Sequence, residues 1–511
     1  MNAKKLVCIV LALLMCLPVL ASCNQGPQIL QPGKANANLD TQYPNADYQG
    51  EEFTFLVIKH TDQIKDYYGG PFIDAEKLTG DKISDAVFNR NSKVEEKYNV
   101  VVNQKEEVGK NPSEVLNTYV MAGDFSYDAI YGWGYKMGAC IPDNYFADFA
   151  TLPNVDLTKE YWAPSAIEDL SVGGTVYLAI NDISMNKLEH AGFIFFNKKV
   201  YDDFQIEDKF GNIYQLVRDG KWTLDTFLEM VKTANRDVNG DSAITRDDVF
   251  GMLDGNGLGS DFLVTCGVSY TTKNEDGSHS LNIYSEKTLG IIEDIHAVFS
   301  SGKYVKSYEE IFNGADTTGY DDQWQYARSI FTTDHALFAG GNANATSETA
   351  FRNMESEYGI VPNPKYDEAQ ENYIAEISPN ASIFAIPATT RQDDLATGSM
   401  ERTGMILEYM SFKSNEVLLP VYYDQVLKGQ RVDGDDAAML DIVRSTTHYE
   451  FAKMYKVPQN EADITVQDTV ELMFTKPATA TSTYNSRKTK LQKELDEYFT
   501  DVLLLAAQGN K

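Results

Sequence analysis

The chain has 511 residues, and its 75 acidic residues outnumber its 44 basic residues, so the formal net charge at pH 7 is −31. This balance excludes a nucleic-acid-binding protein, because a phosphate backbone is bound through clustered Lys and Arg side chains. A single hydrophobic core stops growing at about 250–300 residues, so the length favours two lobes.

The N-terminus has the order of residues that is typical of a lipoprotein export signal. Two lysines precede an apolar run over 6–20, and the run closes with Leu20-Ala21-Ser22-Cys23. The run is interrupted by Pro18 and is shorter than the roughly 20 residues that span a bilayer. We therefore expect residues 1–22 to be removed as a signal peptide. Cys23 would then carry the lipid that anchors the protein to the outer face of a bacterial membrane.

Residues 23–46 are polar, rich in Pro, Asn and Gln, and have no apolar period. This composition is typical of a flexible tether. We expect the rest of the chain to be anchored to the membrane through this tether rather than to span it.

Strands and helices alternate after the tether. The expected elements are a strand at 53–58, a helix at 83–98, a strand at 100–102, a helix at 112–121 and a strand at 127–131. Pro112 suits the first position of its helix and Gly123 suits the end of it. Strands that alternate with helices predict a parallel sheet, and hence an α/β fold.

The second half is more helical. The expected elements are strands at 192–196, 336–339 and 382–386, and helices at 222–235, 286–299, 400–411, 437–443 and 486–505. The apolar residues of these helices recur at helical spacing, which predicts that each helix packs one face on a core.

Five cysteines leave little room for a disulfide framework. Cys8 and Cys16 lie in the signal and Cys23 is the expected lipid site, so only Cys140 and Cys266 remain. They either pair outside the cell or stay as two buried thiols. The sequence has no Cys/His cluster of the kind that holds zinc.

Residues 237–248 have the spacing of a twelve-residue calcium-binding loop. Oxygen ligands fall at positions 1, 3, 5, 7 and 12, which are Asp237, Asn239, Asp241, the Ala243 carbonyl and Asp248. Calcium takes six to eight hard oxygen ligands, and such a loop wraps them around one ion. Position 6 is Ser242 where a glycine is expected, so an acidic turn between helices is the alternative. Bound calcium would be structural, because all its ligands lie in one short loop.

Two further segments are candidates for ligand contact. Trp133 and Tyr135 directly follow an expected strand, and ligands of open α/β sheets bind beyond the carboxyl ends of strands. Asn342 lies in the glycine-rich segment 340–344, where the backbone can approach a ligand closely. The alternatives are aromatic core residues and a plain tight turn.

The sequence offers no motif for catalysis. It contains no GxSxG, no HExxH and no Cys/His arrangement, so we expect a binding protein rather than an enzyme. A surface glycoside hydrolase that uses two of the many carboxylates is the alternative from another class.

Several segments together resemble one family of proteins. They are 85–91 leading to 94–100, Ala122-Gly123-Asp124 ahead of Tyr127-Asp128, 195–198, 220–225 and 358–367. With the lipoprotein signal, their order resembles the extracellular solute-binding proteins of family 1, the substrate-capturing lipoproteins of carbohydrate ABC transporters.

The resemblance implies a two-lobe periplasmic-binding-protein fold of type II, with a hinge and an interlobe cleft that closes on a sugar. One lobe would take 47–188 plus 358–415, and the other 189–357 plus 416–511. The implied partners are a carbohydrate ligand and the permease subunits of an ABC importer, with the protein itself a monomer. A peptide or another polar solute is the alternative ligand. By position in the family, the candidate contacts are His60, Asp62, Trp133, Tyr135, Asp182, Asn342 and Tyr449.

Overall fold

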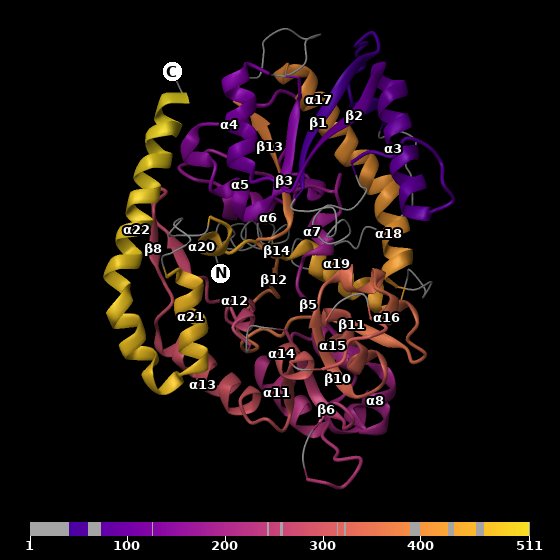
Figure 1. The fold of residues 1–511 in the computed structure, drawn as a ribbon, viewed down its shortest axis with the longest axis vertical. Helices are drawn as coiled ribbons and strands as arrows, with labels where there is room; N and C mark the ends of the chain where they lie inside the picture. Colours follow the sequence, from indigo (N-terminus) through magenta and orange to yellow (C-terminus); the bar gives the residue numbers. More distant parts are fainter. Residues whose placement is uncertain are drawn as a thin grey trace, which may run out of the picture.

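The computed structural model describes residues 40–59, 73–124, 126–242, 245–255, 259–313, 315–320, 323–388, 399–427, 434–455 and 464–509. Two five-stranded sheets with their covering helices form an upper and a lower lobe in Figure 1, and one long C-terminal helix runs along the side of both. The predicted α/β, two-lobe architecture is confirmed.

The first sheet has the strand order β2-β1-β3-β13-β4. Its strands are β1 (Glu51–Lys59), β2 (Val100–Val108), β3 (Ala129–Trp133), β4 (Phe146–Ala147) and β13 (Ser382–Pro387). β1 pairs in parallel with β2 and β3, as the alternating pattern predicted, whereas β13 is antiparallel to β3. Along β1, Phe55 and Leu56 join different core clusters, so apolar residues are buried on both faces of this strand.

Helix ends in this lobe follow from local capping. The covering helices are α3 (Lys82–Tyr98), α4 (Pro112–Ala122) and α17 (Met400–Lys413). The Asp81 side chain accepts a hydrogen bond from the amide of Ser84 at the start of α3. Helix α4 begins with Pro112 and ends at Gly123, whose φ of 64° suits glycine, so both predicted signals are confirmed.

The second sheet has the order β11-β5-β10-β6-β9. Its strands are β5 (Phe193–Asn197), β6 (Phe250–Asp254), β9 (Val305–Ser307), β10 (Ala336–Gly341) and β11 (Tyr358–Pro362). The helices of this lobe include α8 (Lys198–Asp203), α9 (Ile206–Phe210), α11 (Leu224–Thr233), α12 (Asp261–Thr265), α13 (Glu286–Phe299), α14 (Tyr308–Phe312), α15 (Gln323–Thr332), α16 (Thr349–Arg352) and α19 (Asp435–Ser445). Every residue of β5 is buried, as expected of a central strand.

Three described segments of chain that connect the lobes meet where the lobes touch. They run near 190–192, near 375–378 and near 446–448, and they include the parallel pair β12 (Ala375–Glu376) and β14 (Thr447–His448). The amide of Gly192 donates to the carbonyl of Glu376 at 2.8 Å, and the amide of Ile377 donates to that of His448 at 2.8 Å. These backbone bonds tie the crossings into one hinge.

The boundary at which the chain passes from the second lobe back to the first differs from the predicted one. Strand β11 was assigned to the first lobe, but it pairs with β5 in the second sheet. The chain re-enters the first sheet only at β13, so the crossing falls between 362 and 382 rather than at 358. Sequence alone did not separate the two adjacent apolar strands.

The C-terminal helices lie against both lobes. They are α20 (Phe451–Met454), α21 (Val466–Thr475) and α22 (Ala480–Gly509). On α22, Gln492 donates to the carbonyl of His279 in β8 (His279–Leu281), and Tyr498 donates to that of Gly138 in α5 (Gly134–Gly138). Along the described stretches of chain, we find no helix with the length and apolarity that crossing a bilayer requires.

The two cysteines that remain after the signal and the lipid site form no disulfide with each other. Cys140 and Cys266 are free and buried, and burial raises the pKa of each thiol to about 12.

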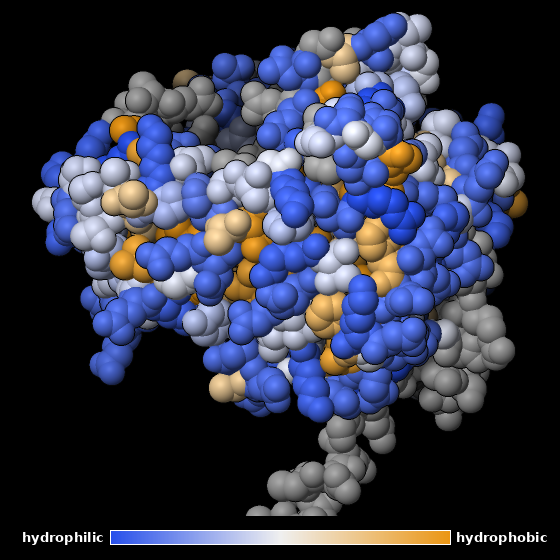
Figure 2. All heavy atoms as spheres, turned by 90° about the horizontal axis from the view of Figure 1, so that it is seen from below, coloured by the Kyte–Doolittle hydropathy of each residue, from blue (hydrophilic) through white to orange (hydrophobic). Residues whose placement is uncertain are grey.

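The face of the molecule seen from below is mostly hydrophilic, with small hydrophobic patches between the polar residues (Figure 2).

Candidate functional site: a cleft between the lobes

A cavity of about 770 Å³ opens where one edge of the second sheet faces the hinge and the first lobe. The carboxyl ends of the parallel strands β6 and β10 and the amino end of the antiparallel β5 meet at this edge. They bring Asp254, Asn342 and Phe193 to the cavity wall. This is the crevice in which ligands of open α/β sheets bind.

Glycines form part of the cavity wall at the end of β10. A Cβ at Gly341 would meet Cε2 of Phe195 at 3.0 Å, and one at Gly340 would meet Cε of Met252 at 3.3 Å. A side chain would crowd Phe195 on one face of the strand at Gly341 and Met252 on the other face at Gly340, so glycine fits both positions.

The first lobe contributes an aromatic pair. The rings of Trp133 and Tyr135 lie edge to face with centroids 4.8 Å apart, and the indole of Trp133 donates to Oδ1 of Asn380 at 3.1 Å. Tyr135 and Asn380 line the cavity, whereas Trp133 contacts both of them but does not line it. Sugars carry an apolar C–H face that suits such a ring.

A second aromatic pair lines the cavity from the other lobe. The rings of Tyr308 and Trp324 are 5.7 Å apart, and Arg328 one helical turn beyond Trp324 forms a two-pronged ion pair with Glu348. Nε of Arg328 lies 2.6 Å from Oε2 of Glu348. Paired in this way, the guanidinium is held rigidly beside the rings.

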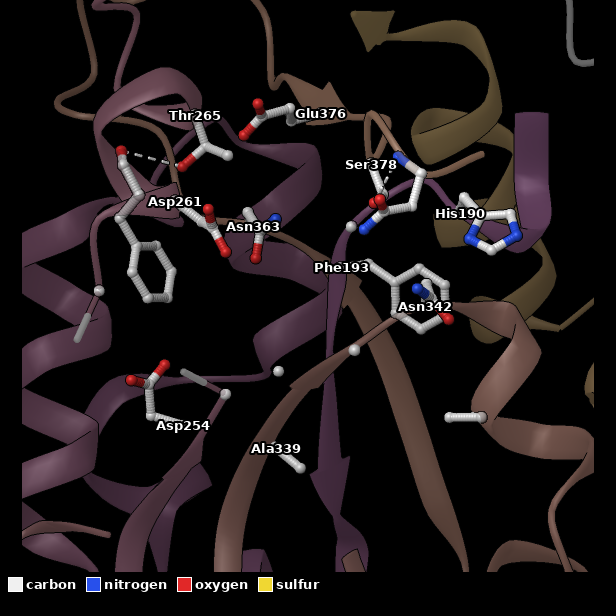
Figure 3. A pocket seen from close by; sticks show the side chains of 18 of the residues that line it. His190, Phe193, Asp254, Asp261, Thr265, Ala339, Asn342, Asn363, Glu376 and Ser378 are labelled. Carbon is white, nitrogen blue, oxygen red and sulfur yellow. Dashed lines mark hydrogen bonds between the residues drawn. The ribbon is translucent and has the colours of Figure 1, made fainter. Parts of the chain in front are cut away.

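Charged residues gather at the hinge side of the cavity. Nζ of Lys453 lies 2.9 Å from Oε1 of Glu376 and 3.2 Å from Oδ1 of Asp261. Burial raises the pKa of Glu376, and the neighbouring ammonium opposes that shift. Figure 3 shows Asp254, Asp261 and Glu376 along one side of the cavity, with His190 and Asn342 on the other.

The structure brings some of the predicted contact residues together. Tyr135 and Asn342 line the same cavity, although they come from different lobes. Their contact with a ligand stays a prediction. His60 and Asp62 lie outside the described residues.

Asp182 and Tyr449 do not line this cavity. Asp182 is 1% exposed, and its carboxylate lies 2.8 Å from Nζ of Lys187 and 2.7 Å from Nη2 of Arg444. Burial opposes its ionisation, but these two cations hold the pKa of Asp182 below its usual value. These ion pairs give Asp182 a structural role beside the hinge, and its contact with a ligand stays a prediction. Tyr449 is equally buried, and its amide donates to Asp169.

The sequence analysis did not predict four charged residues that line the cavity: Asp254, Asp261, Glu376 and Lys453. One of them had a usable signal, because Asp254 ends the apolar run 250–254 and a polar residue after a buried strand is a candidate for the cleft. The others meet only through the packing of α12, β12 and α20 around the hinge.

The predicted calcium loop is closed by its own backbone. Asp237 accepts hydrogen bonds from the amides of Gly240 and Ser242, and Asp248 accepts from those of Val238 and Thr245. The described residues contain no group of three or more His, Cys, Asp or Glu placed to hold a metal. Ala243 lies outside the described residues, so calcium binding stays a prediction. The predicted lipid site Cys23 also lies outside them, and lipidation stays a prediction as well.

Comparison with known proteins finds relatives by fold only. No protein-family profile matches the chain, and no curated protein matches it in sequence. Among solved structures, UspC of M. tuberculosis is 11% identical with a TM-score of 0.54, over 86% of this chain and all of UspC. UgpB of M. tuberculosis, in complex with glycerophosphocholine, is 14% identical with a TM-score of 0.52, over 87% of this chain and 98% of UgpB.

A cyclo/maltodextrin-binding protein complexed with maltotetraose is 13% identical with a TM-score of 0.50, over 89% of this chain and 96% of that protein. The chain therefore has the two-lobe fold of these proteins, as the resemblance implied.

Proposed function

We propose that this chain is the substrate-binding protein of an ABC importer, and that it captures a sugar or oligosaccharide between its lobes. The observation that carries the proposal is the cavity at the strand ends. It has about 770 Å³, within the range of small-molecule sites, and aromatic rings from both lobes face it together with polar side chains. A solved protein of the same fold holds maltotetraose.

The mechanism follows from the connection of the lobes. Tyr135 belongs to the first lobe and Trp324 to the second, so a sugar that contacts both favours the closed arrangement. Backbone hydrogen bonds join the three described segments at the hinge, so we expect the lobes to move about that point as two bodies. A membrane permease would recognise the closed form.

A thermal-shift screen against mono- and oligosaccharides tests the proposal. A ligand at about 100 times its dissociation constant stabilises the fold by roughly 2.7 kcal/mol, which such a screen detects. Trp324→Ala should abolish the shift. Tyr284→Ala is the matched control, because Tyr284 stacks on Tyr484 with centroids 4.5 Å apart and does not line the cavity.

A shift with peptides alone would assign the cleft to a different solute. Release of reducing sugar by the purified protein would instead identify a hydrolase and refute the proposal.

We also propose that the chain is anchored through lipid on Cys23 at the outer face of the cell membrane. The lipoprotein signal supports this assignment. Cys23→Ser should release the protein from the membrane fraction into the medium. A variant that stays with the membrane would contradict the anchor.

For the loop 237–248, we propose one structural calcium ion held by Asp237, Asn239, Asp241, the Ala243 carbonyl and Asp248. The spacing of the oxygens supports it. The melting temperature should fall with a chelator and recover with calcium, and Asp241→Ala should remove that response. Unchanged melting in both conditions would leave an acidic turn.

A further inference from the structure

Arg328 places a guanidinium group in the cavity wall on the side of the second lobe. It follows Trp324 by four residues on α15, and residues four apart on a helix lie on the same face, with Cβ atoms roughly 5–6 Å apart. Both side chains line the cavity. The hydroxyls of a sugar project from the edge of its ring, so a ring that stacks on the indole of Trp324 brings hydroxyls next to Arg328.

Glu348 holds the guanidinium and leaves part of it for a ligand. Nε of Arg328 lies 2.6 Å from Oε2 of Glu348, and Nη2 donates to Oε1. These bonds take two of the five N–H groups of the guanidinium, so the edge formed by Nη1 and the second N–H of Nη2 lies outside the pair. Next to it, the ring centroid of Tyr308 is 5.8 Å from Cζ of Arg328, which limits the movement of the guanidinium.

The position of the pair in the wall suits contact with a ligand. The side chains of Arg328 and Glu348 are each 13% exposed, so the pair is largely shielded from solvent and still reaches the cavity. Glu348 directly follows the 3-10 helix η5 (Ala343–Ser347) and precedes α16. Its bonds to Arg328 therefore connect α15 with the segment that begins after Asn342, and they fix the guanidinium relative to two parts of the wall.

The ion pair also decides which chemical group Arg328 can bind. The carboxylate of Glu348 balances the charge of the guanidinium, so an anionic ligand would gain little there. The remaining edge offers parallel N–H groups in a rigid fork, which bonds two oxygens side by side. Two neighbouring hydroxyls of a neutral pyranose ring supply such a pair of oxygens.

We propose that Arg328 is a specificity-determining residue, which donates to two neighbouring hydroxyls of the sugar ring that stacks on Trp324, and that Glu348 is its positioning residue. This rests on the proposed function and adds the chemical group that the second lobe recognises. The sugar must carry an unsubstituted pair of neighbouring hydroxyls on that ring.

Sugars that lack one hydroxyl test the proposal on the chain without residues 1–22. The probes are glucose, galactose, mannose and the di- and trisaccharides of each, together with their monodeoxy analogues at each ring position. Hydrogen bonds to a charged group are among the stronger ones, so for a sugar that binds, loss of either hydroxyl of one neighbouring pair should lower the affinity about 10- to 100-fold in calorimetry.

Variants connect this discrimination to the guanidinium. Arg328→Lys keeps a cation for Glu348 but replaces the fork by one ammonium, so the affinity for the parent sugar should fall about tenfold, and that for the matching deoxy analogue by less than about threefold. The double variant Arg328→Met, Glu348→Met removes both charges together, which proteins often tolerate, and should give the same pattern if Arg328→Lys does not fold.

Two further variants separate positioning from general effects. Glu348→Gln weakens the bonds that hold the guanidinium, and it should lower the affinity for the parent sugar several-fold more than that for the deoxy analogue. Arg218→Lys is the matched control, because Arg218 also pairs with a carboxylate, that of Asp435, and does not line the cavity; both affinities should stay unchanged.

Each result decides something. Equal losses for the parent sugar and its deoxy analogue in Arg328→Lys would make Arg328 merely structural, and unchanged affinities would show that it does not contact the sugar. A wild-type protein that binds a sugar but tolerates every single deletion of a hydroxyl would also overturn the inference, while the sugar receptor stays intact. Binding of no probe would refute the proposed function, and the inference would fall with it.

Discussion

Asp182 provides the sharpest test of what the structure adds, because the sequence indicated a ligand contact and the structure places it in a buried ion-pair network. Its carboxylate bridges Lys187 and Arg444 and also accepts from Asn415 at 3.1 Å. Asp182→Asn removes the negative charge from between two buried cations, of which Arg444 keeps an ion pair with Glu160. Burial already lowers the pKa of Lys187 to about 8, and the loss of Asp182 would lower it further.

The expected cost follows from the burial of the network. Breaking a buried ion pair by removing one partner costs about 3–5 kcal/mol, and here Lys187 loses its carboxylate while Arg444 keeps its pair with Glu160. We therefore expect Asp182→Asn to lower the free energy of unfolding by about 4 kcal/mol in urea titrations at pH 7, read by circular dichroism.

Asp203→Asn is the control for this measurement. Asp203 pairs with Lys199 at 2.6 Å, but both side chains are about half exposed, so its loss should cost less than about 1 kcal/mol. If Asp182→Asn unfolds like the wild type but no longer binds sugar, the structural assignment is wrong and the original prediction is right.

Two further changes test the hinge and the packing. Burial raises the pKa of Glu450 from 4.5 to about 7, so the folded protein binds this proton more tightly than the unfolded chain does. Stability should therefore fall by about 3 kcal/mol as the pH rises from 4.5 to 7, and Glu450→Gln should flatten this part of the pH profile; an unchanged slope would contradict the assignment. Gly404→Ala places a Cβ against the carbonyl of Pro153 and should cost about 1–3 kcal/mol in thermal unfolding. Gly290→Ala meets no atom within 4 Å and should instead stabilise its helix by about 1 kcal/mol, so equal effects of the two changes would show that the close contact in α17 is absent.

The local elements of this chain were predictable because they depend on residues close together in sequence. Pro112 and Gly123 set the ends of α4, and the apolar run 53–58 marked β1, because capping and strand burial are decided within a few residues. The rule that ligands bind beyond strand ends indicated Tyr135, and the glycine-rich segment 340–344 indicated Asn342; the structure places both in the cavity wall.

Only the tertiary structure decided the charge of the cleft and the location of Asp182. Glu376 and Lys453 lie far apart in the chain and pair because the segments at 375–378 and 446–448 are tied together at the hinge, and Asp254 reaches the same cavity from the end of β6. Asp182 has the same side chain as a ligand-binding aspartate, and only the positions of Lys187 and Arg444 distinguish the two roles. The sequence by itself therefore determined the elements, the α/β class and two of the residues, Tyr135 and Asn342, that line the cavity. Which charges face that ligand depends on long-range packing, which no local pattern encodes.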